Sequence, residues 1–378
     1  MSVVGGLVER DVAENGMAER GVVIETAPRS IPRRINAFLN WKFWLGIVIS
    51  AVFLYLALRG QPLRQTWAAM TRAQYLWLIP AVIAFFVRVG FAAWRWHVLL
   101  RSTKEVPVSR IWPINMIGFM ANNVLPLRAG EALRIYQLGA QEKLSRSGIL
   151  ATLFVERIFD GLTLLSLIVI STLFIPVNDQ VHALTITTAL IFFGALAVFC
   201  LVAFSGAWRL RLLTPVLARL PGKLSESMSR RFDEFVAGLG SLRRGRDVSM
   251  VLVTSFASWL AELGTYLFVA QAFHLNLGIA GAMLTMGVAN VFTLIPSSPG
   301  YVGPFEAGTV LVLQQILHFP SDLTLAYALV IHATLYFPVT IAGAFYWFRH
   351  HLSMNAVSQA QGNATTDRKS TRLNSSHW

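Results

Sequence analysis

Charged residues interrupt the apolar runs of this chain in three groups, and their types suit the binding of an anion. The groups are Arg128, Glu131 and Arg134, then Glu156, Arg157 and Asp160, and finally Glu306. A planar guanidinium donates two hydrogen bonds at once to a phosphate, and a nearby carboxylate can orient it. We therefore interpret the arginines as candidate lipid-phosphate ligands (Arg128, Arg134 and Arg157). The carboxylates are then the groups that line a polar cavity and orient those arginines (Glu131, Glu156, Asp160 and Glu306).

The second group has helical spacing. Glu156 and Asp160 are four residues apart and share one face of a helix, and Arg157 can reach Asp160 three residues further on. Two carboxylates on one face repel each other unless a cation or a shared proton intervenes. We expect Arg128 or Arg134 to supply the remaining positive charge. Two interpretations stay open: a cavity that takes a lipid phosphate, and a buried ion cluster that holds helices together.

Helix-breaking residues surround the first and third groups. The break positions are Asn122, Asn123, Pro126 and Gly130 in the first stretch, and Pro299, Gly300 and Gly303 in the second. Backbone that is freed by Pro and Gly at membrane depth must be covered by protein or line a wet cavity. Both stretches read as a small residue, Asn, an apolar run, Pro, a break and Glu-Ala. This similarity fits a transporter repeat or chance equally well.

The composition predicts an all-α, polytopic transmembrane helix bundle. Hydrophobic residues make up 55% of the 378 residues and charged residues only 13%, whereas soluble domains carry about 25% charged residues. The apolar runs predict eight spans, near Phe43–Leu58, Leu76–Trp94, Gly148–Ile175, Ala183–Phe204, Met250–Phe273, Ile279–Ile295, Phe305–Leu317 and Leu323–Phe348. The shorter run Ile111–Leu125 predicts a re-entrant segment. Arg88 and Glu262 are single charges inside spans and are expected to pair within the bundle.

The rest of the chain is organised around this membrane domain, which we place at residues 41–350. Residues 1–40 are expected to be a disordered cytoplasmic leader, and residues 351–378 a disordered tail whose last part looks non-native. The segment 205–248 is a basic loop, whereas the connections 176–182, 274–278 and 318–322 lack Lys and Arg. The positive-inside rule therefore places the basic loop and both termini in the cytoplasm.

The same composition excludes several function classes. The net charge of +13 is not accompanied by any nucleic-acid-binding motif, so we expect contact with anionic inner-leaflet headgroups and no nucleic acid. No Walker loop, dinucleotide fingerprint or zinc motif occurs, and we expect no cofactor and no metal. The lone Cys200 excludes an intrachain disulfide.

Three motifs in order resemble one family. They are Asn122, Pro126, Arg128, Gly130 and Glu131, then Glu156, Arg157 and Asp160, then Pro299, Gly300, Gly303 and Glu306. Together, across roughly residues 40–350, they are similar to the flippase-like transmembrane domain of the lysylphosphatidylglycerol synthase family. The resemblance implies a bacterial or archaeal plasma-membrane protein that handles lipids. The synthases carry a soluble aminoacyltransferase domain after the membrane part, and the residues after Arg349 are too few for one, so synthase activity is not expected.

Three functions remain open from the sequence. The first is translocation of an anionic phospholipid, glycolipid or polyprenyl-linked lipid without an ATPase of its own. The second is a membrane-embedded enzyme that modifies a lipid headgroup, with Glu131, Glu156 or Asp160 as acid or base. The third is a non-catalytic partner that positions a separate lipid-modifying enzyme through the basic loop. No catalytic residue is assigned, because no nucleophile–base pair is visible.

Overall fold

The computed structural model describes residues 41–125, 128–175 and 222–349, together with the pairs 186–187, 189–190 and 193–194. The regular structure of these residues is helical throughout, which confirms the predicted all-α class. The elements are α1 (Trp41–Leu58), α2 (Leu63–Arg72), η2 (Tyr75–Trp77), α3 (Leu78–Leu100), α4 (Val108–Val124), α5 (Ala129–Glu142), α6 (Arg146–Thr172), α10 (Gly222–Gly238), η5 (Leu239–Arg243), α11 (Gly245–Ala272), α12 (Gly278–Phe292), η6 (Pro299–Tyr301), α13 (Pro304–Val310), the π-helical turn η7 (Leu311–Ile316) and α14 (Ser321–Arg349). The leader and the tail lie outside the described residues, as does almost all of the predicted span 183–204.

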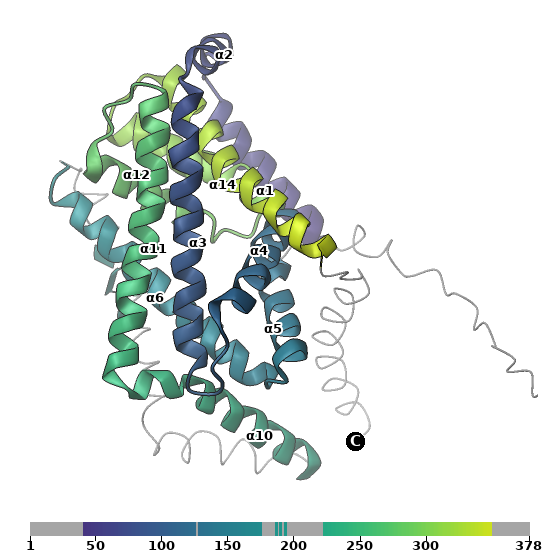
Figure 1. Cartoon of the computed structure of the whole chain (residues 1–378). Helices are drawn as coiled ribbons and strands as arrows, with labels where there is room; N and C mark the ends of the chain where they lie inside the picture. The colour runs from purple at the N-terminus through teal and green to yellow at the C-terminus, as the bar shows by residue number, and fades with distance from the viewer. Residues whose placement is uncertain are drawn as a thin grey trace, which may run out of the picture. The chain divides into compact units, whose positions relative to one another are not determined.

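Three of the described helices are long and apolar enough to cross a bilayer. They are Tyr75–Leu100, Gly245–Ala272 and Ser321–Arg349, and the pair α1–α2, bent by 83°, makes a fourth if it counts as one span. Helix α6 has the required length of 27 residues but carries three charges in its middle, which lowers its mean hydropathy. Figure 1 shows α3 and α11 side by side at the front of the bundle, where they pack along most of their length.

Helices α4 and α5 form an antiparallel hairpin of the re-entrant kind that the sequence predicted. Gly118 of α4 lies against the side chain of Arg134, and Gly130 of α5 lies against the carbonyl oxygen of Gly118. The two open ends of the hairpin meet at the lower end of the bundle in Figure 1, where Arg110 pairs with Glu142 at 2.9 Å. The chain therefore enters from one side, turns within the bundle and returns to the same side.

A second hairpin replaces two of the predicted spans. Residues 279–295 and 305–317 were expected to cross the membrane separately, but α12 has only 15 residues, and α13 and η7 have 7 and 6. At 1.5 Å per residue each arm is about 20 Å long, well short of the roughly 30 Å of hydrocarbon. Gly281 lies against Leu317 and Gly308 against Phe292, so the two arms are antiparallel. This hairpin opens at the end opposite the first one.

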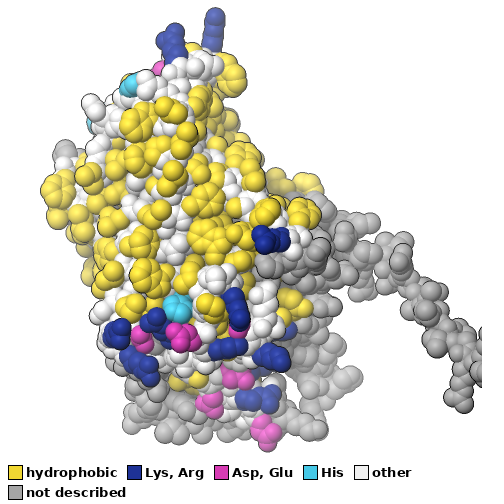
Figure 2. Space-filling model, in the orientation of Figure 1, with side chains coloured by type: hydrophobic (Ala, Val, Ile, Leu, Met, Phe, Trp, Pro, Cys, Tyr) yellow, Lys and Arg dark blue, Asp and Glu magenta, His cyan; other side chains and the backbone are white. Residues whose placement is uncertain are grey.

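The surface of the bundle separates into an apolar belt and a charged end. Figure 2 shows hydrophobic side chains over the middle of the visible face and a concentration of Lys, Arg, Asp and Glu towards its lower end. Helix α10, part of the predicted basic loop, lies at that lower end and packs against α6 (Figure 1). At the other end the described connections 273–278 and 317–320 lack Lys and Arg, but α2 and the connection before it carry Arg59, Arg64 and Arg72 (Figure 1). The charged residues are thus concentrated at the lower end, and a smaller group of cations lies at the upper end (Figure 2).

Candidate functional site: a polar cavity where the two hairpins meet

The tips of the two hairpins are in contact inside the bundle. Arg128, at the start of α5, donates a hydrogen bond to the carbonyl oxygen of Thr293 at 3.1 Å. Its guanidinium also lies 5.4 Å from the centre of the Tyr301 ring, which belongs to the second break. Asn123, at the end of α4, donates to the hydroxyl of Thr340 on α14 at 2.9 Å. The described residues of the two breaks, 122–125 with 128–131 and 293–306, therefore border one site.

The first break is held by its own polar residues. Asn122 accepts a hydrogen bond at 2.9 Å from the backbone N–H of Gly130, one of the free donors at the start of α5. Arg128 has a backbone φ of 53°, which lies in the left-handed region. Residues other than glycine adopt this region at a cost of about 1–2 kcal/mol. Gly130 is required by close approach, since a Cβ there would lie 1.9 Å from the carbonyl oxygen of Gly118. Pro126 lies outside the described residues.

The second break is held by a carboxylate and a histidine. Pro299 begins the short turn η6, Gly300 has φ 75° and Gly303 has φ 99°. Glu306, in the first turn of α13 as its position predicted, accepts a hydrogen bond from the backbone N–H of Gly303 at 2.7 Å. Its other oxygen lies 2.5 Å from Nδ1 of His332 on α14. Local sequence does not predict this pairing, because His332 stands alone in its apolar run.

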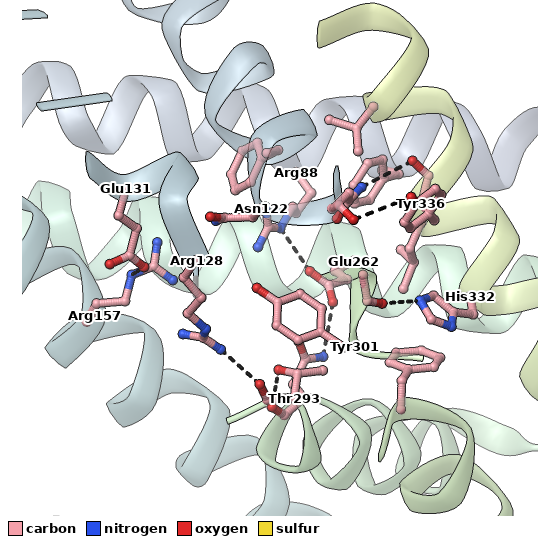
Figure 3. A pocket seen from close by; sticks show the side chains of 18 residues that line it. Arg88, Asn122, Arg128, Glu131, Arg157, Glu262, Thr293, Tyr301, His332 and Tyr336 are labelled. Carbon is pink, nitrogen blue, oxygen red and sulfur yellow. Dashed lines mark hydrogen bonds and ion pairs between the residues drawn. The ribbon is translucent and has the colours of Figure 1, made fainter. Parts of the chain in front are cut away.

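A cavity of about 170 Å³ lies where the breaks meet. Figure 3 shows its side chains, with Arg128 directed towards Thr293 and the Tyr301 ring between Arg128 and His332. The lining contains charged groups, amides and aromatic rings; these include Arg88, Arg128, Glu131, Arg157, Glu262 and His332, then Asn122, Asn123 and Asn290, then Phe85, Phe119, Tyr301, Phe305 and Tyr336. The volume is below the roughly 300–1,000 Å³ of sites for drug-sized ligands. It suits a small polar headgroup and not a whole lipid.

Behind the cavity lies an ion cluster that contains the second group of charges. Its members are Arg95, Arg134, Arg157, Glu131, Glu156 and Asp160. Glu156 is 1% exposed and accepts hydrogen bonds from both terminal nitrogens of Arg134, at 3.2 and 3.0 Å. Arg157 donates to Glu156 at 3.0 Å and lies 3.5 Å from Asp160 and 3.6 Å from Glu131. The three arginines balance the three carboxylates, as buried charges require.

Arg95 is the member of this cluster that the sequence did not reveal. It directly follows Trp94, the predicted end of the second span, and is not among the candidate site residues. In the structure α3 continues to Leu100, and Arg95 is 2% exposed. It donates to Asp160 at 2.7 Å, and this pairing makes its burial possible. Arg88 and Glu262 pair with each other at 2.8 Å, which confirms the prediction that both find partners within the bundle.

The arginines interpreted as phosphate ligands occupy three different positions. Arg134 is 2% exposed, makes both terminal hydrogen bonds to Glu156 and stacks on Trp96 at 4.2 Å, away from the cavity wall. Arg157 lines the cavity with 39% of its side chain exposed but is shared among three carboxylates. Arg128 lines the cavity and, among the described residues, has no carboxylate within 4 Å.

Comparison with known proteins relates the whole membrane domain to one family. The model of the lysylphosphatidylglycerol synthase TM region matches residues 43–343. A UPF0104 membrane protein of Methanocaldococcus jannaschii is 22% identical over 227 residues, which is 60% of this chain and 92% of that protein. Glycosyltransferase AglD of Haloferax volcanii is 26% identical over 256 residues, 60% of this chain but only 41% of that protein. The chain thus spans less than half the length of the second relative.

The matched residues include both hairpins, the ion cluster and the cavity. They also cover well over half of the chain, and they contain the three motifs on which the resemblance was based. The chain therefore belongs to the lysylphosphatidylglycerol synthase TM-region family.

Proposed function

We propose that the chain translocates a lipid with an anionic headgroup, without an ATPase of its own. The observation that carries this proposal is the position of Arg128. It is the cavity-lining arginine with no carboxylate partner among the described residues, whereas Arg88 and Arg157 are both paired. A partly desolvated guanidinium of this kind favours an anion, and the phosphate shared by phospholipids, polyprenyl-linked lipids and many glycolipids fits its planar fork.

The backbone of Arg128 supports the same role. A non-glycine residue in the left-handed region stores about 1–2 kcal/mol of strain, and such strain clusters at functional sites. Arg128 contacts the backbone carbonyl of Thr293 and the ring of Tyr301. A phosphate can replace the carbonyl as hydrogen-bond acceptor and, among the described residues, no ion pair with a carboxylate has to break. In this proposal the headgroup enters the cavity between the hairpins while the acyl tails stay in the bilayer.

A scrambling assay tests the proposal. Purified protein is reconstituted into vesicles that contain a trace of fluorescent phosphatidylglycerol or, in a parallel sample, fluorescent phosphatidylcholine. Dithionite then quenches the outer leaflet. We expect the protein to raise the quenched fraction above the half accessible in protein-free vesicles, and to do so faster for the net anionic lipid. An unchanged half for both lipids, with protein shown to be folded and inserted, contradicts translocation.

A partner role is the second candidate, and the relation to glycosyltransferase AglD favours it over a catalytic one. That protein is matched over only 41% of its length, so a membrane domain of this family occurs within a longer protein. In this reading α10 and the charged lower end of the bundle would position a separate lipid-modifying enzyme. Recovery of such an enzyme with the tagged protein, combined with no scrambling by the purified chain, would move the assignment from translocation to this role.

We further propose that the protein lies in the plasma membrane with both termini and α10 in the cytoplasm. The support is the concentration of cations around α10 and the lack of Lys and Arg in the described connections 273–278 and 317–320, although Arg59, Arg64 and Arg72 near α2 lie at that other end. Single cysteines are introduced in a Cys200→Ser background, one at the exposed Glu226 on α10 and one at the exposed His318. An impermeant maleimide added to intact cells should label His318→Cys and not Glu226→Cys. The reverse labelling would invert the topology.

A further inference from the structure

His332 is held at both of its ring nitrogens by groups that accept hydrogen bonds. Nε2 lies 2.8 Å from the carbonyl oxygen of Gly300, and Nδ1 lies 2.5 Å from Oε1 of Glu306. A backbone carbonyl only accepts, so Nε2 must carry a proton. The contact between Nδ1 and Oε1 needs a second proton, on the ring or on the carboxyl group. The pair therefore holds one proton more than a neutral imidazole beside a carboxylate.

Among the described residues, no other side chain makes a hydrogen bond to His332 or to Glu306. The second oxygen of Glu306 is occupied by the backbone N–H of Gly303 at 2.7 Å. The ring of His332 packs against Phe305, with centroids 4.6 Å apart, and against Tyr336 at 6.1 Å. The other charged or titratable groups that line the cavity are Arg88 from α3, Glu262 from α11, Arg128 and Glu131 from α5, Arg157 from α6 and Tyr301 from η6. Helix α2, which also packs against α14, carries only the exposed cations Arg64 and Arg72.

We propose that Glu306 and His332 form a proton-binding site, and that its proton holds the second break against α14. The site borders the cavity, and 12% of the His332 side chain is exposed, so water in the cavity can exchange the proton. On release, one proton passes to that water, and the remaining one stays on Nδ1 as the donor to ionised Glu306. Nε2 then presents a lone pair to the carbonyl oxygen of Gly300. Two acceptors 2.8 Å apart repel, and the link breaks.

The geometry of Gly300 explains why this link controls the break. Gly300 has φ 75°, and a Cβ there would lie 2.6 Å from the Tyr336 ring and 3.4 Å from the carbonyl oxygen of Asn123 in the first hairpin. Gly300 is therefore packed between α14 and the tip of the first hairpin. The next residue, Tyr301, covers Arg128. Loss of the His332 link frees Gly300 on one side and so loosens Tyr301 above the anion-binding candidate.

The bound proton also alters the charge of the interior. The cavity and the ion cluster contain five arginines and, apart from Glu306, four carboxylates. With its proton the Glu306–His332 pair is neutral, and the interior carries one net positive charge; without it the interior is neutral. Proton binding and anion binding therefore favour each other, and by linkage each raises the affinity for the other by the same factor.

Nitrogen NMR of the full chain in lipid nanodiscs tests the proton site directly. The protein is labelled with ¹⁵N-histidine, and the His332 signals are those missing from His332→Gln. Spectra are recorded from pH 5 to pH 9, and we expect these signals to change with pH as one nitrogen loses its donor character. The Glu306→Gln variant, which keeps the side-chain shape but cannot ionise, should shift the midpoint. His332 signals that stay constant over the whole range overturn the proposal.

A spin label on the second break tests the mechanical consequence. The label is attached at Val302→Cys in a Cys200→Ser background, and its line shape is recorded over the same pH range. We expect mobility to rise with the His332 titration, to lose its pH dependence in His332→Gln and to keep it in the control His318→Gln, which changes an exposed histidine. A pH response that persists in His332→Gln, or no response while His332 titrates, overturns the proposal. Neither measurement uses lipid movement, so failure here and failure of translocation remain distinguishable.

Discussion

The guanidinium of Arg128 lies 3.1 Å from the carbonyl oxygen of Thr293, and this contact between residues 165 positions apart in the sequence helps to join the tips of the two hairpins. Each hairpin is too short to cross the hydrocarbon alone. Side chains pair with backbone groups at both tips: Asn122 accepts a hydrogen bond from the N–H of Gly130, and Glu306 accepts one from the N–H of Gly303. Broken elements that meet within a bundle are how membrane proteins build polar sites at depth.

We predict that Gly130→Ala separates the arms of the first hairpin. The added methyl group would lie 1.9 Å from the carbonyl oxygen of Gly118 and 2.6 Å from the side chain of Asn122. Overpacking of this kind costs typically 1–3 kcal/mol, and here the blocking atom is backbone that cannot rotate away. The measurement is thermal stability in detergent by size-exclusion fluorescence. The matched control is Gly245→Ala, where no atom lies within 4 Å. Equal stability of the two variants would show that the arms are not in this contact.

Arg95→Met should destabilise the bundle strongly. The change removes the cation that lies 2.7 Å from Asp160 and 3.6 Å from Glu156, and it leaves a buried carboxylate short of its partner. Breaking a buried ion pair from one side costs about 3–5 kcal/mol. The control is Arg72→Met, at an exposed position on α2. The same unfolding assay should place the Arg95 variant far below the control. Similar behaviour of the two would mean that Asp160 is neutral or solvated in the native protein.

The charged lower end of the bundle should give a pH-dependent contribution to stability. Hydrogen bonds from Lys104 and from Arg110 lower the pKa of Glu142 below its usual value, against the opposite effect of burial. A group whose folded pKa is lowered stabilises the protein fully above its unfolded pKa of about 4.3, and this contribution is lost as the pH falls through the folded pKa. The difference in melting temperature between wild type and Glu142→Gln should therefore be constant above about pH 5 and shrink in acid. A difference that grows in acid would have the wrong sign.

The sequence predicted the parts of this site that depend on local composition. Pro, Gly and Asn residues located both breaks, and the spacing of Glu156 and Asp160 placed them on one face of α6. Charged residues in apolar runs had to be compensated, and the pairing of Arg88 with Glu262 follows from that requirement.

The parts that the sequence did not reveal depend on contacts between distant segments. Arg95 marked the apparent end of an apolar run, and only its partner Asp160 on another helix shows that it is buried. The arms of the second hairpin are as apolar as spans, and their length of about 20 Å becomes decisive only when their antiparallel packing is known. The pairing of His332 with Glu306 joins residues 26 positions apart through a fold that local spacing does not define.

In the proposed function, Arg128 binds the anionic group of the transported lipid. The decisive measurement is the rate at which the Arg128→Ala variant scrambles fluorescent phosphatidylglycerol. A charge-assisted hydrogen bond contributes about 1.5–3 kcal/mol, so we expect a fall of roughly 10- to 100-fold in the rate at limiting lipid. Arg128→Lys should recover part of this loss, because it keeps the charge but not the planar fork.

The comparison uses equal amounts of folded, inserted protein, with Arg64→Ala as a control at an exposed arginine. We expect this control to scramble phosphatidylglycerol at the wild-type rate and Arg128→Ala to fall well below it. Wild-type scrambling by Arg128→Ala would rule out anion binding by Arg128 and leave its contact with Thr293 as a structural link between the hairpins.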